Sequence, residues 1–579
     1  MMPRELKISV GQHSDKGRKE TNQDFHGVLV PDEPLLGLKG IAVVLADGIS
    51  SSNVSRIAAE SAVKGFLTDY YCTSESWSVR TSAQRVLEAT NSWLHSQTRS
   101  QYSYDRDRGY VCTLSALVLK STTGHLFHVG DSRIYRVSGN TLEQLTEDHR
   151  IVVSSQQSYL GRALGANSQV EVDYLAFKVE QGDTFVLVTD GIYEHVGERV
   201  MARMVRDGTA DLEQAAKAIV ELAYELGSKD NLTVQIVRVD EVPDAAAREV
   251  FGQPHELPPP PLLEARQIFD GFRIIRELHG SSRSHIYLAA DIETEAVVTI
   301  KIPSIDLRDD PDYLKRFMME EWVARRIDSP HVLKPCPPQR RRNFLYVVTE
   351  FIDGQTLSQW MIDNPAPSLE VVRGIVEQIA KGLRAFHRKE MLHQDVRPDN
   401  IMIDATGTVK IIDFGSTKIT GVVEAAPSGN HNDVLGTQQY TAPEYFLGEP
   451  VSPRADLFSL GVITYQMLTG KLPYGAQIAR ARTRSQFSKL VYHPAAHGAR
   501  EIPQWIDGTL EKAVHPNPGK RYGSLSEFLF DLRHPNANYL STSSTPLIER
   551  NPLLFWKSTT IVLALAVILL LGLQHFGHR

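Results

Sequence analysis

Short apolar runs separated by polar turns characterise the first 240 residues. Several runs are rich in β-branched residues and have the length of buried strands: IAVVLADG, TLSALVLK, HLFHVGDSRIYRV, TFVLVTDG and LTVQIVRV. Apolar residues recur with helical spacing near 54–70 and near 211–227. The pattern predicts one domain of strands and helices over residues 1–240.

A second block, residues 268–535, changes character along its length. It begins with strand-like runs and continues with helical periodicity at 368–388 and 456–469. That change favours an α+β domain with a sheet-rich part and a helical part. Between the blocks, residues 241–267 include the run Pro258–Pro261, which favours extended chain and predicts a linker.

The C-terminal region breaks the globular pattern. After a polar tether at 536–552, residues 553–573 are apolar except for Lys557. About 20 apolar residues in a helix cross a membrane, and a lysine near the end can extend to the headgroups. Trp556 and Phe576 lie where interfacial aromatic residues are expected. The sequence predicts a single transmembrane helix over 553–573; the alternative is a buried terminal helix.

Charge and cysteine content narrow the function classes. Lys and Arg number 62 against 69 Asp and Glu, a near balance that gives no electrostatic footprint for nucleic acid. The three cysteines, Cys72, Cys112 and Cys336, are far apart, which excludes a disulfide framework or a cysteine zinc site and suits a reducing compartment. The N-terminus lacks the apolar core of a signal peptide. We therefore expect a single-pass protein of the cell inner membrane, C-terminally anchored, with both blocks cytoplasmic.

Four aspartates in the first block lie beside strand-like runs. They are Asp24 in TNQDFHG, Asp47 before Gly48, Asp190 in VTDG and Asp230 in KDNLTV. Strand ends can direct such carboxylates into one cleft, where their repulsion would raise their pKa values. A hard divalent ion such as Mg²⁺ or Mn²⁺ relieves that repulsion and prefers oxygen ligands. Two such ions can activate a water for attack on a phosphoryl group.

The first block resembles the metal-dependent Ser/Thr phosphatases of type 2C. The matching motifs, in order, are SDKGRKETNQD, VVLADG, CTLSALVL, HVGDSRIYR, LTEDH, LGRALG, LVTDG and SKDNLTV. The resemblance implies an αββα sandwich with a binuclear metal centre. It assigns the metals to the four aspartates and the Gly48 carbonyl, with Asp131 at the position of a third metal. The phosphate-facing basic residue would be Lys19 or Arg18, with a lysine offering a point charge instead of a bidentate fork.

The second block carries residues suited to phosphoryl transfer. In LHQDVRPDNIMID, Asp395 can accept the proton of an attacking hydroxyl and Asn400 can hold a metal ion. In KIIDFGS, Asp413 can bridge Mg²⁺ to nucleotide phosphates. Lys301 ends the run VVTIK, where it can reach the α- and β-phosphates. Its ion-pair partner would be Glu320 or the neighbouring Glu321.

These motifs, with TAPEY and SPRADLFSLGVITYQMLTGKLPY, resemble the eukaryotic-type protein Ser/Thr kinases. The resemblance implies a two-lobed fold with ATP between the lobes. It assigns Glu350 to Ile352 to the adenine-contacting hinge and Thr349 to the gatekeeper position. It also assigns Glu444 and Arg521 to the ion pair that anchors the activation segment. Asp456 would be the acidic residue that braces the catalytic loop.

The second block also departs from the kinase pattern. Where the family's Gly-rich loop has three glycines, this chain has His279, Ser281 and Ser284, with Gly280 and Ile286 among them. Glycines let backbone amides approach the phosphates, so their loss predicts weaker nucleotide binding. Gln394 replaces the arginine that receives an activation-loop phosphate, which suggests activity independent of that contact. Arg397 replaces the usual catalytic-loop lysine.

The sequence therefore predicts a membrane-anchored bifunctional enzyme that uses ATP and Mg²⁺ in one domain and Mn²⁺ or Mg²⁺ in the other. Its partners would be ATP and proteins bearing Ser/Thr or phospho-Ser/Thr, including its own kinase domain. We expect autophosphorylation in the segment between Asp413 and Glu444, reversed by the phosphatase domain. The candidate acceptors are Thr437 and Thr441, with Ser416 and Thr417 nearby. The alternative is an active phosphatase joined to a pseudokinase that serves as scaffold or ligand-binding domain.

Overall fold

The computed structural model describes most of the chain. The described residues are 5–102, 108–154, 157–208, 210–243, 257–281, 283–337, 339–415, 417–419, 437–497, 502–536, 539 and 552–576. Part of the predicted linker, 244–256, and most of the predicted polar tether, 537–538 and 540–551, lie outside these residues.

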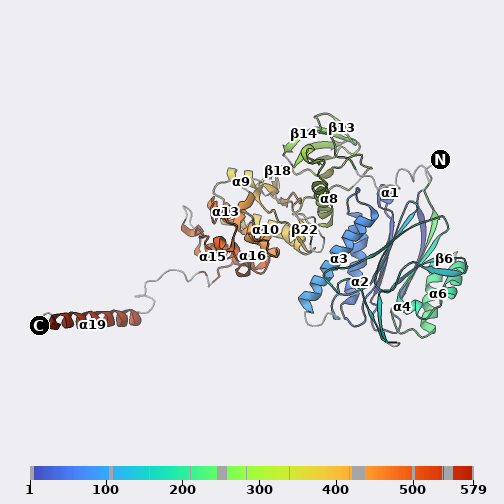
Figure 1. Ribbon diagram of the computed structural model, residues 1–579. Coiled ribbons are helices and arrows are strands. Elements are labelled where there is room, and N and C mark those ends of the chain that lie inside the picture. Colours follow the sequence, from blue (N-terminus) through green and yellow to red (C-terminus); the bar gives the residue numbers. More distant parts are fainter. Residues whose placement is uncertain are drawn as a thin grey trace.

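Two antiparallel five-stranded sheets form the sandwich of the first domain (Figure 1). The first sheet has the order β1 (Lys7–Asp15), β12 (Leu232–Glu241), β11 (Thr184–Val188), β6 (Arg133–Ser138) and β7 (Thr141–Gln144). The second has the order β10 (Asp173–Lys178), β5 (Thr123–Val129), β4 (Leu114–Lys120), β3 (Ile41–Asp47) and β2 (Asp24–Leu29). A separate hairpin joins β8 (Arg150–Ser154) to β9 (Gln157–Leu160).

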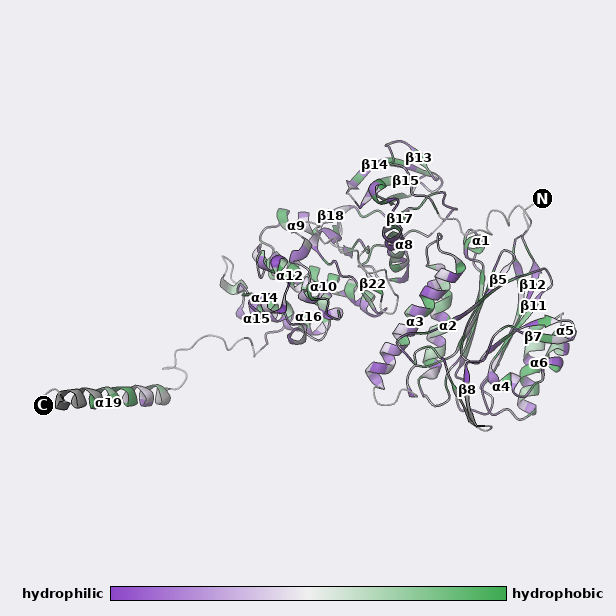
Figure 2. Cartoon of the chain, in the orientation of Figure 1, coloured by the Kyte–Doolittle hydropathy of each residue, from purple (hydrophilic) through white to green (hydrophobic). Residues whose placement is uncertain are grey.

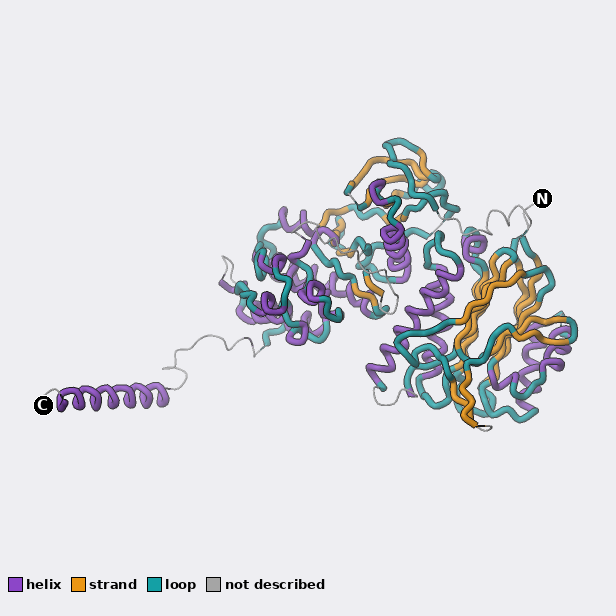
Figure 3. Tube along the Cα trace, viewed as in Figure 1, coloured by secondary structure: helices purple, strands orange, loops and turns teal. Residues whose placement is uncertain are grey.

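Helices cover both outer faces of the sandwich (Figure 3). The second sheet carries α2 (Ser55–Tyr71) and α3 (Val79–Gln101), with the short α1 (Leu35–Lys39) beside them. The first sheet carries α4 (Asp190–Tyr193), α5 (Glu198–Asp207) and α6 (Leu212–Glu225). The apolar runs in the sequence form buried strands because both sheet faces are covered. The predicted αββα architecture is confirmed.

Helix α3 was not predicted from the sequence. It is rich in Ser, Thr and Gln, and its buried apolar positions, among them Val79, Ala83, Val86 and Leu87, are separated by many polar ones. Its start does carry a readable signal, since Ser78 accepts a hydrogen bond from the Thr81 amide as an N-cap. The run HLFHVGDSRIYRV was expected as one stretch but forms two strands, β5 and β6, that belong to different sheets.

The second domain has two lobes. Its first lobe is a five-stranded sheet of β13 (Ile268–Phe269), β14 (Phe272–Gly280), β15 (Ser284–Asp291), β16 (Val297–Pro303) and β17 (Val347–Glu350). Helix α8 (Pro311–Arg326) packs beside this sheet, and Asp310 caps it by accepting from the amides of Asp312 and Tyr313. In Figure 1, α8 stands between this lobe and helices α2 and α3 of the first domain.

The second lobe is mainly helical. Its helices are α9 (Leu357–Asp363), α10 (Leu369–His387), α11 (Pro443–Leu447), α12 (Pro453–Thr469), α13 (Gln477–Arg480), α14 (Arg484–Ser488), α15 (Gln504–Ala513) and α16 (Leu525–Arg533). Short strands β18 (Gly354–Thr356), β20 (Ile401–Asp404) and β21 (Val409–Ile411) form one sheet, and β19 (Met391–Leu392) pairs with β22 (Lys418–Ile419). Helix α12 is buried around almost its whole circumference, as a central helix must be.

A last helix, α19 (Pro552–Phe576), follows at the C-terminus. Its described side chains include exposed apolar residues, and Figure 2 colours part of the helix as hydrophobic. Within the described part of the chain, no helix combines the length and apolarity that crossing a membrane requires. The predicted transmembrane helix over 553–573 is therefore not confirmed.

Candidate active sites

Strand pairing brings the first two aspartates together. In the β2–β3 ladder, Asp24 is the direct partner of Asp47. Thr233 and Thr189 donate hydrogen bonds of 2.6 and 3.0 Å to Oδ2 of Asp24. The other oxygen, Oδ1, is buried without a hydrogen-bond partner among the described residues. A buried carboxylate oxygen that accepts no hydrogen bond is suited to binding a cation.

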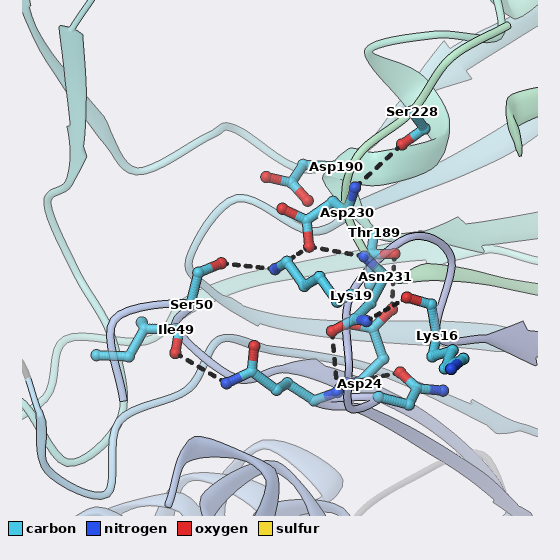
Figure 4. Close-up of polar contacts among 12 residues, drawn as sticks. Lys16, Lys19, Asp24, Ile49, Ser50, Thr189, Asp190, Ser228, Asp230 and Asn231 are labelled. Atoms are coloured by element: carbon cyan, nitrogen blue, oxygen red, sulfur yellow. Dashed lines mark hydrogen bonds and ion pairs between the residues drawn. The ribbon is translucent and has the colours of Figure 1, made fainter. Parts of the chain in front are cut away.

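Asp190 and Asp230 approach from the first sheet. Asp190 opens α4 directly after β11, and Asp230 lies two residues before β12 begins. Figure 4 shows both carboxylates on the same side of the cleft, above Asp24. The neighbouring Gly48 leaves no room for a side chain, because a Cβ there would lie 2.6 Å from the Ser55 carbonyl oxygen. Gly48 therefore lets the end of β3 pack closely against the start of α2.

Burial and mutual repulsion shift these carboxyl groups strongly. Burial raises the pKa of Asp24 to about 6, although hydrogen bonds from Thr233 and Thr189 oppose the shift. Burial first, then the charges of Asp24 and Asp190, raise the pKa of Asp47 well above its usual range. Burial, with the charges of Asp131 and Asp230, raises the pKa of Asp190 to about 7. Such a group favours a positive ion among its members.

Two cationic side chains form ion pairs with these acidic residues in the structure. Arg150, at the start of β8, contacts Asp131 at 2.6 Å, Asp190 at 2.9 Å and Glu194 at 2.6 Å. Lys19 pairs with Asp230 and donates a 2.7 Å hydrogen bond to Ser50 (Figure 4). The sequence interpretation missed Arg150. It directly follows the LTEDH motif, but nothing in its spacing indicates that it reaches carboxylates on other elements.

The donor set suits a hard divalent ion. Asp24, Asp47, Asp190 and Asp230 offer carboxylate oxygens, which are ligands that Mg²⁺ and Mn²⁺ prefer. Over the described residues, no group of three or more His, Cys, Asp or Glu side chains converges on one metal position. Arg150 and Lys19 instead divide the carboxylates between them. The orphaned Oδ1 of Asp24 is the feature that best fits a metal ligand.

The structure separates the two candidates for the phosphate-facing residue. Lys19 points into the cleft toward Asp230. Arg18 points away: its guanidinium lies 5.1 Å from the centre of the Tyr224 ring and donates to the Tyr224 carbonyl. Of the two candidates, Lys19 is therefore the one that lies at the carboxylate cleft.

In the second domain, Lys301 on β16 joins two acidic residues from other elements. Its Nζ lies 2.6 Å from Oε1 of Glu320 on α8 and 3.2 Å from Oδ1 of Asp413. Burial opposes the charge on Lys301, but Asp413 and Glu320 prevail and raise its pKa. The Lys301 charge, in turn, lowers the pKa of Asp413 against burial. Glu321 faces elsewhere, toward Arg325 and Arg342, so Glu320 is the partner of Lys301.

The catalytic loop places the predicted proton acceptor beside the predicted metal ligand. Asn400 donates from Nδ2 to the carbonyl and to Oδ2 of Asp395, both at 2.9 Å. Nε of Arg397 lies 3.9 Å from Oδ2 of Asp395. The buried Asp456 on α12 accepts from the backbone amides of His393 and Gln394 and so braces the loop. Gln394 itself has φ of 67°, a conformation that such a brace must hold in place.

The expected hinge lies at the end of β17. Oε1 of Glu350 accepts from the Lys334 amide and Oε2 accepts from Lys410 at 2.7 Å, so this side chain is engaged within the protein. Ile352 is buried. Thr349 and Thr299 on β16 share a 2.6 Å hydroxyl–hydroxyl hydrogen bond. The hinge side chains are thus fixed by contacts within the protein, which leaves nucleotide contact to their backbone.

The segment aligned with the Gly-rich loop is closed by a serine. Oγ of Ser281 accepts from the amides of Arg283 and Ser284 at 3.2 and 3.1 Å, and donates to the Ser284 carbonyl. Gly280 and Ile286 lie on the strands that flank the turn, β14 and β15. In a glycine-rich loop, the backbone amides contact the nucleotide phosphates; in this turn, the amides of Arg283 and Ser284 bind the Ser281 hydroxyl instead.

The activation segment is described only at its ends. Arg521 forms a bidentate ion pair with Glu444, with distances of 2.7 and 2.8 Å, and both side chains are buried. Thr417 is buried, and Thr441 immediately precedes the cap of α11. Thr437 opens a short helical turn. The candidate acceptor Ser416, and residues 420–436, lie outside the described residues.

Comparison with known proteins matches both domains. The protein phosphatase 2C family profile matches residues 12–226, and the protein kinase domain profile matches residues 274–530. The Bacillus subtilis serine/threonine-protein kinase PrkC is 26% identical over 272 residues, which are 47% of this chain and 41% of that protein. The chain thus spans about two-fifths of the length of that curated relative.

Two solved structures are each similar to a part of this chain. The PknI kinase domain of Mycobacterium tuberculosis is 25% identical and covers 47% of this chain and 98% of its own, with a TM-score of 0.36. The catalytic domain of the phosphatase PstP, solved with two manganese ions, is 22% identical and covers 41% of this chain and all of its own, with a TM-score of 0.34.

The two profile matches define the class of each domain. This chain joins a type 2C protein phosphatase domain to a protein Ser/Thr kinase domain, in that order.

Proposed function

We propose that the chain phosphorylates protein Ser/Thr residues with ATP and Mg²⁺ and hydrolyses phospho-Ser/Thr with Mn²⁺ or Mg²⁺. The observation that carries the proposal is the pairing, in each domain, of charged residues that lie apart in the sequence. Lys301 contacts Glu320 and Asp413 in the kinase domain. In the phosphatase domain, strand pairing joins Asp24 to Asp47.

In the kinase domain, each residue has a role consistent with its contacts. Lys301, held by Glu320, orients the α- and β-phosphates, and Asp413 and Asn400 hold Mg²⁺. Asp395 accepts the proton of the substrate hydroxyl, and Arg397 places positive charge beside it. Gly280, Ser281, Ser284 and Ile286 cover the nucleotide, while the backbone from Glu350 to Ile352 receives the adenine.

In the phosphatase domain, Asp24, Asp47, Asp190 and Asp230, with the Gly48 carbonyl, would hold two divalent ions, and Asp131 a third. Ions bound there would supply an activated water for in-line attack on phosphorus. Lys19 binds the substrate phosphate as a point charge. Arg150 pairs with Asp131 and Asp190, and Lys19 pairs with Asp230, so bound ions would share these carboxylates with two cationic side chains.

Joining the two domains raises the effective concentration of each for the other's product. We propose that the kinase domain phosphorylates its own segment between Asp413 and Glu444 and that the phosphatase domain reverses this. The test is ³²P incorporation from labelled ATP into the full chain, compared among wild type, Asp190→Ala and Asp395→Ala. More label in Asp190→Ala than in wild type, and none in Asp395→Ala, is expected. Equal label in wild type and Asp190→Ala would exclude reversal by the phosphatase domain.

A second candidate, a phosphatase with a pseudokinase domain, is favoured by one observation. The amides of Arg283 and Ser284 are bound by the Ser281 hydroxyl instead of facing a ligand. In that case Asp395→Ala and wild type would incorporate equal, background label, while hydrolysis of p-nitrophenyl phosphate with Mn²⁺ would proceed.

We also propose that α19 anchors the chain at the cell inner membrane, with both catalytic domains cytoplasmic. Support comes from the exposed apolar side chains along the helix, including Trp556, Ile561, Leu565 and Ile568. Exposed apolar surface of this extent favours a membrane or another apolar partner. Fractionation of cells expressing the full chain or a chain ending at residue 551 tests this. Equal recovery of both in the soluble fraction would overturn it.

A further inference from the structure

Helix α8 has one side toward the nucleotide site and the other toward the phosphatase domain. Glu320 reaches Lys301 on the first side. Trp322, two residues later, is rotated about 200° around the helix axis and points the other way. Its ring lies 5.5 Å from that of Trp77, at 62°, and its Nε1 donates to the Asp69 carbonyl. Trp322 is completely buried, and Trp77 and Asp69 of the phosphatase domain are among the residues that contact it.

A buried ion pair fixes the end of the same helix. Arg326, the last residue of α8, contacts Asp69 on α2 at 2.8 Å, and the two side chains are only 5% and 7% exposed. The Arg326 guanidinium also lies 4.8 Å from the centre of the Trp322 ring. Breaking a buried pair by removing one partner leaves an uncompensated charge, so this contact strongly favours one position of α8.

A second group of buried charges lies at the same contact. Glu321 on α8 binds Arg342 and Arg325, each at 2.7 Å. Nε of Arg342 is in turn 3.8 Å from Glu75, in the turn between α2 and α3. Charges on both domains therefore depend on one another for neutralisation.

The turn that makes these contacts is itself rigidly held. Lys39, at the end of α1, donates to Thr73 at 2.8 Å and to the Ser74 carbonyl at 2.6 Å, and all three residues are buried. The stretch from Asp69 to Trp77, here called the docking corner, thus presents a fixed surface to α8. A rigid surface can transmit a position to the helix that packs on it.

We propose that the phosphatase domain is the activating partner of the kinase domain within the same chain. The docking corner holds α8 where Glu320 can pair with Lys301, and loss of that contact releases α8 and inactivates the kinase. The inference rests on the proposed kinase function for its activity readout, but the position of α8 can be measured without catalysis.

The experiment uses full-length chains with charge reversals. The variants are Asp69→Arg, Arg326→Asp and the double variant. The matched control is Glu60→Arg, because Glu60 lies on α2, as Asp69 does, but in an exposed pair with Lys64. Each chain is assayed for ATP-dependent labelling of casein, for p-nitrophenyl phosphate hydrolysis with Mn²⁺, and for hydrogen–deuterium exchange of α8 amides.

Each single reversal is expected to lower kinase activity about tenfold, a change typical of coupling between two sites. It should also accelerate hydrogen–deuterium exchange of the α8 amides. Phosphatase activity should stay within about twofold, as for distant, independent sites, which shows that this domain remains folded. The double variant should recover most of the kinase activity and the slow exchange, while Glu60→Arg should behave as wild type.

Two outcomes would overturn the inference. One is kinase activity in Asp69→Arg equal to that of wild type; the other is α8 exchange unchanged by either single reversal. If wild type transfers no phosphate, the proposed kinase function fails, and the exchange rates of α8 alone then decide whether the docking corner positions the helix.

Discussion

Oε1 of Glu320 lies 2.6 Å from Nζ of Lys301, and both side chains are largely enclosed. Burial raises the pKa of Glu320, and the Lys301 charge opposes that shift. We expect Glu320→Gln to lower the kinase rate at least about tenfold, because it leaves Lys301 with only the more exposed carboxylate of Asp413. Initial rates of casein labelling would measure this. Glu370→Gln, an exposed residue on α10, is the control, and equal rates in both variants would contradict the role of Glu320.

The serine that closes the turn between β14 and β15 offers a gain-of-function test. Ser281→Gly should free the amides of Arg283 and Ser284 and lower the KM for ATP about fivefold, the equivalent of roughly one hydrogen bond. Ser281→Ala removes the same hydroxyl without adding backbone freedom, so it separates the two effects. A KM unchanged or raised in both variants would show that the serine does not restrict nucleotide binding.

Metal removal should destabilise the phosphatase domain. The cleft gathers carboxyl groups whose pKa values are raised by burial and repulsion, so a bound cation relieves a cost present in the metal-free protein. Excess Mn²⁺ should raise the melting temperature of the full chain, by the equivalent of about 2.7 kcal/mol at 100 times the dissociation constant. EDTA should reverse the shift, and Asp190→Ala should reduce it. Melting curves insensitive to Mn²⁺ would contradict a metal site.

Some residues of the two candidate active sites, and of the contact between the domains, could be predicted from the sequence, and others could not. Aspartates at strand ends could be predicted because a buried run followed by a turn fixes where the side chain emerges, as for Asp47. Glu320 could not be distinguished from Glu321, because adjacent helix residues differ by only about 100° around an axis whose orientation is unknown. The contact of Trp322 with Trp77 joins residues of different domains, and no local pattern reports such packing.

The buried amine of Lys39 predicts a pH dependence of stability. Burial, assisted by the charge of Lys120, lowers the pKa of Lys39 from 10.5 to about 7. Between these values the unfolded chain binds more protons than the folded one, so the free energy of unfolding should rise with pH across this window. The contribution is at most about 1.4 kcal/mol per pH unit.

Lys39→Met removes this titration. Urea unfolding of the full chain at pH 7, 8 and 9 should give a shallower rise in the variant than in wild type. Lys64→Met, at an exposed lysine on α2, should keep the wild-type slope. Parallel slopes in wild type and Lys39→Met would show that the amine is charged in the folded protein throughout this range.

The central claim is that one chain both adds and removes phosphate. The most direct measurement follows ³²P on the full chain over time, with labelled ATP and Mg²⁺ present and Mn²⁺ or EDTA added. With Mn²⁺, Asp190→Ala should accumulate more label than wild type, because only wild type can remove it, and Asp395→Ala should acquire none. Equal label in wild type and Asp190→Ala, or equal label in wild type and Asp395→Ala, would contradict the claim.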